Sequence, residues 1–271
     1  MELSDRMKRY ENLYQQQFCP LVPVIARLDG RAFHTFCNGM IKPFDKDFHD
    51  LMVQTTVYLV EASNAIVGYT QSDEISLLFY SDRFESQVFF DGKVMKMVST
   101  LAAMASVKFN DMLVMGCSPV VERIHGGCTP VTFDCRAANY PVEEVANYFI
   151  WREQDAVRNS IQAAAQYYFS HKSIQNLNGK QLQEKLFQEK QINWNDYSYQ
   201  QKRGTYVRIK KVSTPFTADE IESLPPKHHA RTNPDLVVER RQVVLEEVPI
   251  LTTIANRTEF LLYGFDPIKN T

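Results

Sequence analysis

The order of short and long hydrophobic segments between residues 21 and 137 constrains the fold of this chain more than any other feature. Short runs rich in β-branched and aromatic residues, which are typical of strands, alternate there with longer runs at helical spacing. We expect strands at residues 21–28, 65–69, 75–80 and 131–137, and helices at residues 47–62 and 93–115. The order strand, helix, strand, strand, helix, strand predicts an α+β protein of the ferredoxin-like (βαββαβ) class.

The second half of the chain has a different pattern. Apolar residues recur at helical spacing from residue 142 to about residue 169, which predicts one long amphipathic helix. A stretch rich in Gln and Asn at residues 173–194 predicts a shorter helix with loops, and two further strands are expected at residues 205–212 and 236–245. We therefore divide the chain into a first domain, residues 1–137, and a C-terminal helical and β-containing region, residues 138–271.

Composition limits the classes of function that are open to the chain. A net charge of −2 and a pI of about 6.3 argue against a protein that coats nucleic acid through an overall basic surface. No apolar run approaches the roughly 18 residues of a membrane span, and the first ten residues lack the apolar core of a signal peptide. We therefore expect a cytoplasmic protein without a membrane partner.

An odd number of cysteines without a Cys-x-x-Cys pair argues against a disulfide framework or a zinc site and predicts buried free thiols at Cys19, Cys37, Cys117, Cys128 and Cys135.

Two aspartates, Asp29 and Asp73, stand at strand ends that this fold brings together. The first and third strands of a ferredoxin-like sheet are antiparallel neighbours, so the end of the first strand lies beside the turn between the second and third. Neighbouring carboxylates repel unless a cation neutralises them, and oxygen ligands, including the Gly30 carbonyl, favour Mg²⁺. This pattern predicts two Mg²⁺ ions about 4 Å apart, suited to activating a hydroxyl and stabilising a leaving pyrophosphate. The alternative is that both aspartates only form turns; the adjacent Glu74 is a supporting catalytic candidate.

The segment that follows the first strand is a candidate phosphate site. Gly30 permits close approach of a ligand to the backbone, and successive N–H groups from Gly30 to His34 can cradle an anion. The segment lacks the spacing of a P-loop, so the signal is weak by itself. Lysines within reach would strengthen the prediction of a phosphate site: Lys42 after the first strand, and Lys93 and Lys96 at the start of the second helix. Lysines at such places are, however, commonly solvated.

Several short motifs occur in a fixed order along residues 20–212. The first two are Arg27-Leu28-Asp29-Gly30-Arg31-Ala32-Phe33-His34 and Gln71-Ser72-Asp73-Glu74. They are followed by Phe133-Asp134-Cys135-Arg136 with Tyr140-Pro141, by Trp151-Arg152 with Asp155, and by Lys202-Arg203-Gly204-Thr205. Each motif is short, but the ordered set resembles the tRNA-histidine guanylyltransferase family of 3′-to-5′ nucleotide polymerases.

The resemblance implies a polymerase palm in residues 1–137, with residues 138–271 contributing to RNA binding and to assembly as a homotetramer. It implies a reaction in which the 3′-hydroxyl of an incoming nucleotide, GTP foremost, attacks a tRNA 5′ end that is triphosphorylated or has been activated with ATP. By this analogy Asp29, the Gly30 carbonyl and Asp73 hold two Mg²⁺ ions. The nucleotide triphosphate would lie along Gly30, Arg31, Ala32, Phe33, His34 and Ser72, with Lys42, Lys93 and Lys96 around the phosphates.

One departure from the family pattern follows the Trp-Arg motif. Guanylyltransferases that act on histidine tRNA carry His-Ile-Asn-Asn where this chain has Val157-Arg158-Asn159-Ser160. The chain is in this respect similar to the bacterial and archaeal guanylyltransferase-like branch, which implies templated repair of truncated tRNA 5′ ends. Strict guanylylation of histidine tRNA is the alternative. A nucleotide cyclase is a further enzyme alternative, and a non-catalytic RNA- or nucleotide-binding module is the alternative from another class.

Two polar groups are candidates for contact with RNA. Arg152, Asp155 and Asn159 share one face of the long predicted helix and form either contacts to the RNA end or a buried ion-pair network. The second group is a basic stretch without acidic residues, formed by Lys202, Arg203, Arg208, Lys210 and Lys211. These cations either bind a phosphate backbone or protect a solvated edge strand from aggregation by their charge.

Overall fold

Six antiparallel strands form one sheet in the computed structural model, which describes residues 1–86, 88–115, 118–124, 130–233 and 235–270. The strand order is β4–β1–β3–β2–β5–β6. The strands are β1 (Val24–Gly30), β2 (Val67–Gln71), β3 (Glu74–Phe79), β4 (Phe133–Asn139), β5 (Thr205–Pro215) and β6 (Val237–Glu246). β1 and β3 are antiparallel neighbours, and β4–β1–β3–β2 is the arrangement expected of the ferredoxin-like fold, so the predicted fold class is confirmed.

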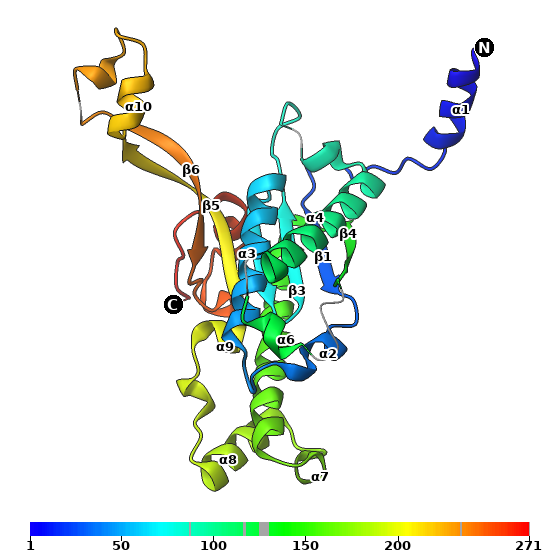
Figure 1. The fold of residues 1–271 in the computed structure, drawn as a ribbon, viewed down its shortest axis with the longest axis vertical. Coiled ribbons are helices and arrows are strands. Elements are labelled where there is room, and N and C mark those ends of the chain that lie inside the picture. Colours follow the sequence, from blue (N-terminus) through cyan, green and yellow to red (C-terminus); the bar gives the residue numbers. More distant parts are fainter. Residues whose placement is uncertain (87, 116–117, 125–129, 234, 271) are drawn as a thin grey trace.

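Helices cover both faces of this sheet (Figure 1). One face packs on α3 (Lys46–Ser63) and α4 (Val94–Val114), and the other packs on α6 (Val142–Tyr168). Side chains alternate along β1: Leu28 joins the core with α3 and α4, whereas Ile25 joins the core with α6. Asp29 follows the odd positions of β1 and therefore projects toward the α6 side of the sheet.

The predicted elements agree with the structure except at their ends. α3, α4 and α6 correspond to the helices expected at residues 47–62, 93–115 and 142–169. α3 begins at an N-cap, Asp45, whose carboxylate accepts from the Phe48 amide (3.0 Å) and from Arg123 (2.9 Å). β1 runs to Gly30 and does not end at residue 28, because its last residues still pair with β3 and β4.

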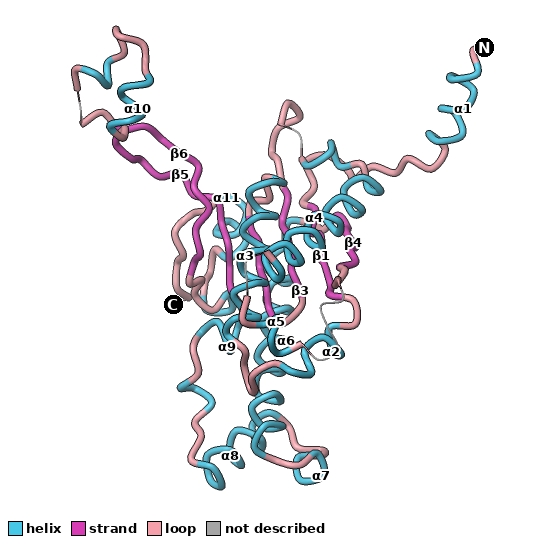
Figure 2. Tube along the Cα trace, viewed as in Figure 1, coloured by secondary structure: helices cyan, strands magenta, loops and turns pink. Residues whose placement is uncertain are grey.

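The two C-terminal strands extend the same sheet. β5 pairs with β2 along its first four residues and with β6 from Tyr206 to Pro215. The outer parts of β5 and β6 leave the body as an arm that carries α10 (Ala218–Ser223) at its end (Figure 2). The sheet thus continues across residue 137, where we divide the chain, and that division stays a prediction.

Short elements complete the chain. α6 continues past the sheet and packs on α8 (Gly179–Lys190) through a small core that includes Ile161, Leu186 and Trp194. The remaining helices are α1 (Leu3–Asn12), α2 (Phe33–Phe36), α5 (Val120–Arg123), α7 (His171–Ile174), α9 (Tyr199–Arg203) and α11 (Arg257–Tyr263). Single 3₁₀ turns lie at Cys37–Gly39, Phe89–Gly92, Trp194–Asp196, His229–Arg231 and Leu251–Thr253.

Neither a membrane helix nor a disulfide is found in the part of the chain that the structure describes. None of the described helices has both the length and the apolar character needed to cross a membrane. Cys37 and Cys135 are partly buried free thiols, and Cys19 is free but exposed, which corrects the expectation that it is buried. Cys117 and Cys128 lie outside the described residues.

Candidate active site

The end of β1 and the turn between β2 and β3 meet at one end of the sheet. Ser72 and Asp73 form this two-residue turn, and Ser72 has a positive φ of 50°. The amide of Gly30 donates to the carbonyl of Asp73 at 3.1 Å, and Asp29 pairs directly with Glu74. The sheet therefore brings Asp29 and Asp73 to one place, as its topology predicts.

A third carboxylate, Asp134, lies opposite Asp29 on β4. Residues that pair directly across strands project from the same face, so Asp134 and Glu74 flank Asp29 on the α6 side. The side chain of Asp134 is 60% exposed and lies 3.0 Å from Arg136. Asp134 has no role in the sequence-based prediction beyond its place in a motif. The alternation around Phe133 in the expected strand is a sufficient signal to place Asp134 on the face opposite Phe133, which joins the core with α3 and α4.

The two predicted metal ligands form an electrostatically unfavourable pair. Burial raises the pKa of Asp73 above its usual value, and the nearby charge of Asp29 raises it further. Hydrogen bonds from the Asp73 backbone and the Ser72 hydroxyl oppose this shift in pKa. Within the described ranges, no three Asp, Glu, His or Cys side chains form a complete metal site. Two carboxylates could still hold Mg²⁺, which commonly takes one or two protein carboxylates and completes its shell with water and substrate phosphates.

The segment after β1 turns sharply and is anchored by Phe33. A Cβ on Gly30 would overlap the Phe33 ring, so glycine is required for this close approach. The Phe33 ring packs on Phe109 and Phe133, with ring centroids 5.5 and 5.3 Å apart. Phe33 is thus a buried anchor, while three other residues expected along the triphosphate are exposed: Arg31, Ala32 and His34.

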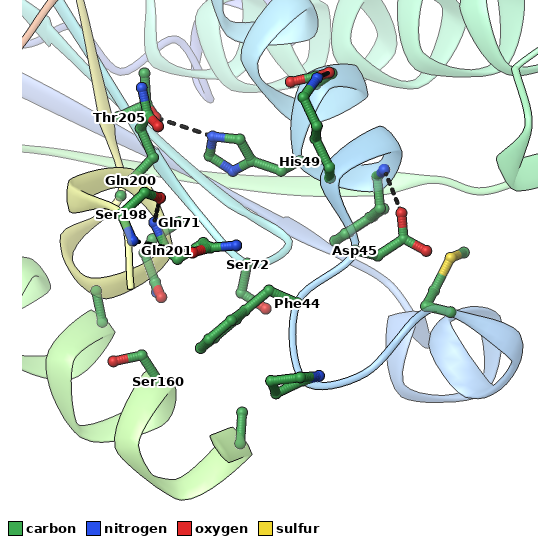
Figure 3. Close-up of a pocket in the computed structure, with 18 of the residues that line it drawn as sticks. Phe44, Asp45, His49, Gln71, Ser72, Ser160, Ser198, Gln200, Gln201 and Thr205 are labelled. Carbon is green, nitrogen blue, oxygen red and sulfur yellow. Dashed lines mark hydrogen bonds and ion pairs between the residues drawn. The ribbon is translucent and has the colours of Figure 1, made fainter. Parts of the chain in front are cut away.

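A cavity of about 660 Å³ opens beside the β2–β3 turn (Figure 3). Lys42 and Ser72, both expected near phosphates, line it. His49 of α3 lies 3.1 Å from the Thr205 hydroxyl, and burial lowers the pKa of His49. Much of the other polar lining consists of amides and hydroxyls suited to hydrogen bonding with an uncharged group such as a nucleobase: Gln71, Asn159, Ser160, Ser198, Gln200 and Gln201. The sequence offered no signal that joins them, because they come from separate elements.

Lys93 and Lys96 lie at the other end of the sheet, which corrects the expectation that they lie within reach of the phosphate segment after β1. Lys93 pairs with Gln17 in an isolated bridge and, with Lys96, lines a different cavity next to Tyr80, just beyond β3. The far end of α4 approaches the β1 terminus, where the Asn110 side chain donates to the carbonyl of residue 131 at 2.7 Å. A helix of 21 residues such as α4 spans about 30 Å, which separates the two lysines from the carboxylates.

Comparisons with known proteins show the family to which the chain belongs. The family model described as Thg1: tRNAHis guanylyltransferase matches residues 4–141, half of the chain. The chain belongs to this family. A relative described as uncharacterized protein R259, from Acanthamoeba polyphaga mimivirus, is 31% identical over 231 residues, which cover 78% of each chain.

Two solved structures of Thg1-like proteins from bacteria resemble the chain over most of its length. The bacterial Thg1-like protein in complex with ATP has a TM-score of 0.75 and 38% identity, covering 96% of this chain and 100% of that chain. The bacterial Thg1-like protein in complex with GTP has a TM-score of 0.68 and 36% identity, with coverages of 92% and 94%. The palm-type fold and the bacterial-like branch expected from the motifs agree with these matches. The chain is thus a nucleotidyltransferase of the tRNA guanylyltransferase type.

In this Thg1-family chain the polar residues of α6 form a partly buried ion-pair network. Arg152 is buried; its Nε lies 2.8 Å from Glu74 and its Nη2 lies 2.5 Å from Asp155. Burial raises the pKa of Glu74, and the charges of Arg152 and Arg27 lower it. Glu74 is therefore committed to Arg152, and of the three predicted RNA contacts on α6 only Asn159, beside the cavity, is exposed.

The predicted basic stretch is largely paired with acidic and carbonyl groups from elsewhere in the chain. Arg208 is 5% exposed and donates to the carbonyls of Phe260 (2.6 Å) and Leu261 (3.1 Å), so it does not offer RNA a surface contact. The other four cations lie within ion-pair or hydrogen-bond distance of Glu153, Asn195, Glu239 and Glu246. β6 supplies two of these carboxylates, Glu239 and Glu246, which the local sequence between residues 202 and 218 lacks.

Proposed function

We propose that the chain adds nucleotides, GTP foremost, to the 5′ end of tRNA in the 3′-to-5′ direction. The observation that carries this proposal is the convergence of Asp29 and Asp73 at one end of the palm sheet, beside the exposed segment that follows β1. Family membership supplies the reaction class. The ATP and GTP bound to bacterial relatives support nucleoside triphosphates as ligands of this chain.

In the proposed reaction, the 3′-hydroxyl oxygen of the incoming nucleotide forms a bond to the α-phosphorus of a triphosphorylated RNA 5′ end, and pyrophosphate leaves. From a 5′ end that has been adenylylated with ATP, AMP leaves instead. Asp29, the Gly30 carbonyl and Asp73 would hold two Mg²⁺ ions, whose chemistry is to activate the hydroxyl and neutralise the leaving group. The backbone from Arg31 to His34, with Ser72 and Lys42, would bind the triphosphate of the incoming nucleotide.

Removing either carboxylate tests the proposal. We expect Asp29→Ala and Asp73→Ala each to lower Mg²⁺-dependent incorporation of radiolabelled GTP into tRNA by at least about tenfold, or about 1.4 kcal/mol in the barrier. Asp219→Ala, which removes an exposed carboxylate of α10 far from the site, is the matched control and should retain activity. Nuclease mapping locates the label; a label at the 3′ end, or full activity in both variants, would contradict the proposal.

Within this reaction class we propose templated repair of truncated 5′ ends. Val157, which stands where guanylyltransferases of histidine tRNA carry histidine, packs against the small core between α6 and α8 and offers no polar group to RNA. We expect the purified protein to prefer a tRNA lacking its first nucleotide over full-length histidine tRNA, and to select each added nucleotide by the opposing base. Preference for the full-length tRNA regardless of that base would instead identify a strict histidine-tRNA guanylyltransferase.

We further infer that the chain assembles as a homotetramer, the state implied by the family motifs. α1 supports assembly, because the helix lies away from the body and buries none of its residues (Figure 1).

A further inference from the structure

Two arginines and a tryptophan lie on the α6 side of the sheet, next to the carboxylates. Arg27 of β1 pairs with Arg136 of β4, and Asp29 pairs with Asp134 two residues further along the same two strands. Residues two apart on a strand project from the same face about 7 Å from each other, so a pair of cations adjoins a pair of anions. Trp151 of α6 lies against this group, with its ring centroid 5.8 Å from the Arg27 guanidinium carbon.

Trp151 is held in place but remains accessible. The guanidinium carbon of Arg152 lies 4.1 Å from the centroid of the Trp151 ring, and Tyr148 packs edge-on at 5.8 Å. Trp151 nevertheless remains 48% exposed. An exposed aromatic ring whose orientation is fixed by its neighbours is suited to stacking against a nucleic-acid base.

Both arginines retain hydrogen-bonding capacity for an anion. The Nη1 of Arg27 lies 4.0 Å from Glu74, beyond hydrogen-bond distance, and the Arg27 side chain is 20% exposed. The side chain of Arg136 is 59% exposed, and its partner Asp134 is equally open to solvent. Exposed ion pairs of this kind are weak, so a phosphate can compete for Arg136.

We propose that Arg27, Arg136 and Trp151 bind the 5′-terminal nucleotide of the RNA substrate. Its first base would stack on Trp151, and its 5′ phosphate would lie between the two arginines. This inference rests on the proposed function, since it assigns the RNA end to one side of the Asp29–Asp73 site.

The positions of the two proposed sites on the sheet indicate that the RNA end, and not the incoming nucleotide, binds Arg27, Arg136 and Trp151. The proposed triphosphate segment is anchored by Phe33 in the core with α3 and α4, and Lys42 lines the cavity to which α3 and α6 both contribute. Arg27 and Trp151 contact each other on the α6 side of the sheet and are not among the residues that line this cavity. The two substrates would thus occupy separate sites next to the same carboxylates, as bond formation between them requires.

Tryptophan fluorescence tests this assignment directly, because the chain has two tryptophans and the other, Trp194, is 7% exposed. We expect an RNA hairpin with a 5′ monophosphate to quench the emission of the full-length protein, and the same hairpin with a 5′ hydroxyl to bind about tenfold more weakly. Trp151→Phe should abolish the quenching. Trp151→Ala should raise the KM for the hairpin about tenfold and leave the KM for GTP unchanged.

Arg136→Gln should likewise weaken binding of the phosphorylated hairpin about tenfold. Arg83→Gln is the matched control, because this arginine is 78% exposed and follows β3 at the other end of the sheet. Unchanged emission on adding the phosphorylated hairpin, or equal affinity for both hairpins, would overturn the proposal. Equal quenching of Trp151 by GTP or ATP would also overturn it, because the site would then bind a free nucleotide.

These binding measurements separate the inference from the function on which it rests. Absence of quenching in a protein that still adds nucleotides at the 5′ end would refute the Trp151 site alone. Quenching as expected in a protein that adds no nucleotide would support the site and contradict the proposed catalytic function.

Discussion

Glu153 is a carboxylate whose chemistry is changed by burial. In the sequence it looks like an ordinary polar position of an amphipathic helix, yet its side chain is 4% exposed. It accepts a hydrogen bond from the Tyr206 hydroxyl at 3.0 Å, and Arg203 lies 4.0 Å away. Burial raises the pKa of Glu153 to about 7, and its contacts with Tyr206 and Arg203 oppose the shift. The folded protein therefore holds this proton more tightly than the unfolded chain does.

This shift makes stability depend on pH. Because the pKa rises from 4.5 to about 7 on folding, the contribution of Glu153 is fully present below pH 4.5 and is lost as the pH rises to about 7. The side chain in Glu153→Gln cannot ionise. We therefore expect the free energy of unfolding of this variant, minus that of wild type, to be about 2 to 3 kcal/mol larger at about pH 8 than at about pH 5. Urea denaturation at both pH values measures this difference. Glu143→Gln, at an exposed position of the same helix, should show none.

At the scale of elements, local patterns predict the strands and helices but not every neighbour. The meeting of Asp29 and Asp73 follows from the order of four strands alone, because that order fixes which strand ends adjoin. In the same topology β3 runs away from Asp73. The helix that follows β3 therefore begins, with Lys93, at the opposite end of the sheet. The prediction that Lys93 lies near the phosphates overlooked this direction. The carboxylate partners of the basic strand β5 lie on β6, and no local pattern reveals the register of that pairing.

The junction between α9 and β5 depends on one glycine. Gly204 has φ +82° and ψ −171°, and a Cβ there would lie 2.5 Å from the Thr70 carbonyl and 2.8 Å from the Tyr69 hydroxyl. Thr70 is backbone-paired with β5, so it cannot move without separating the strands. We expect Gly204→Ala to lower the free energy of unfolding by at least about 2 kcal/mol in urea denaturation.

Gly179→Ala is the matched control for this change. Gly179 begins α8, and a Cβ there would meet only a methyl group of Ile161 at 3.7 Å. Its effect should remain within about 0.5 kcal/mol. Equal stability of the two variants would show that the junction between β2 and β5 adapts to a side chain.

At the scale of the whole molecule, α1 is a helix whose residues are not buried against any part of the chain that the structure describes. Leu3, Met7 and Tyr10 recur at helical spacing on one face and are 63%, 45% and 63% exposed. A helix of 10 residues is marginal in water unless its apolar face packs against something. The helix lies apart from the body of the molecule (Figure 1), so a second copy of the chain is the partner that the proposed tetramer supplies.

A charge on this apolar face should therefore weaken assembly. We expect light scattering to give wild type the mass of four chains of 31.4 kDa, and Met7→Asp to shift the population toward smaller species at the same concentration. Lys8→Asp changes the charge of α1 by more, but at an exposed position off the apolar face, and should leave the mass unchanged.

Burying an aspartate carboxylate is costly only where the face is covered. A shift in Met7→Asp alone therefore identifies the apolar face of α1 as a contact between chains. Equal shifts in both variants would attribute the effect to net charge, and a wild-type mass of one chain would contradict the tetramer.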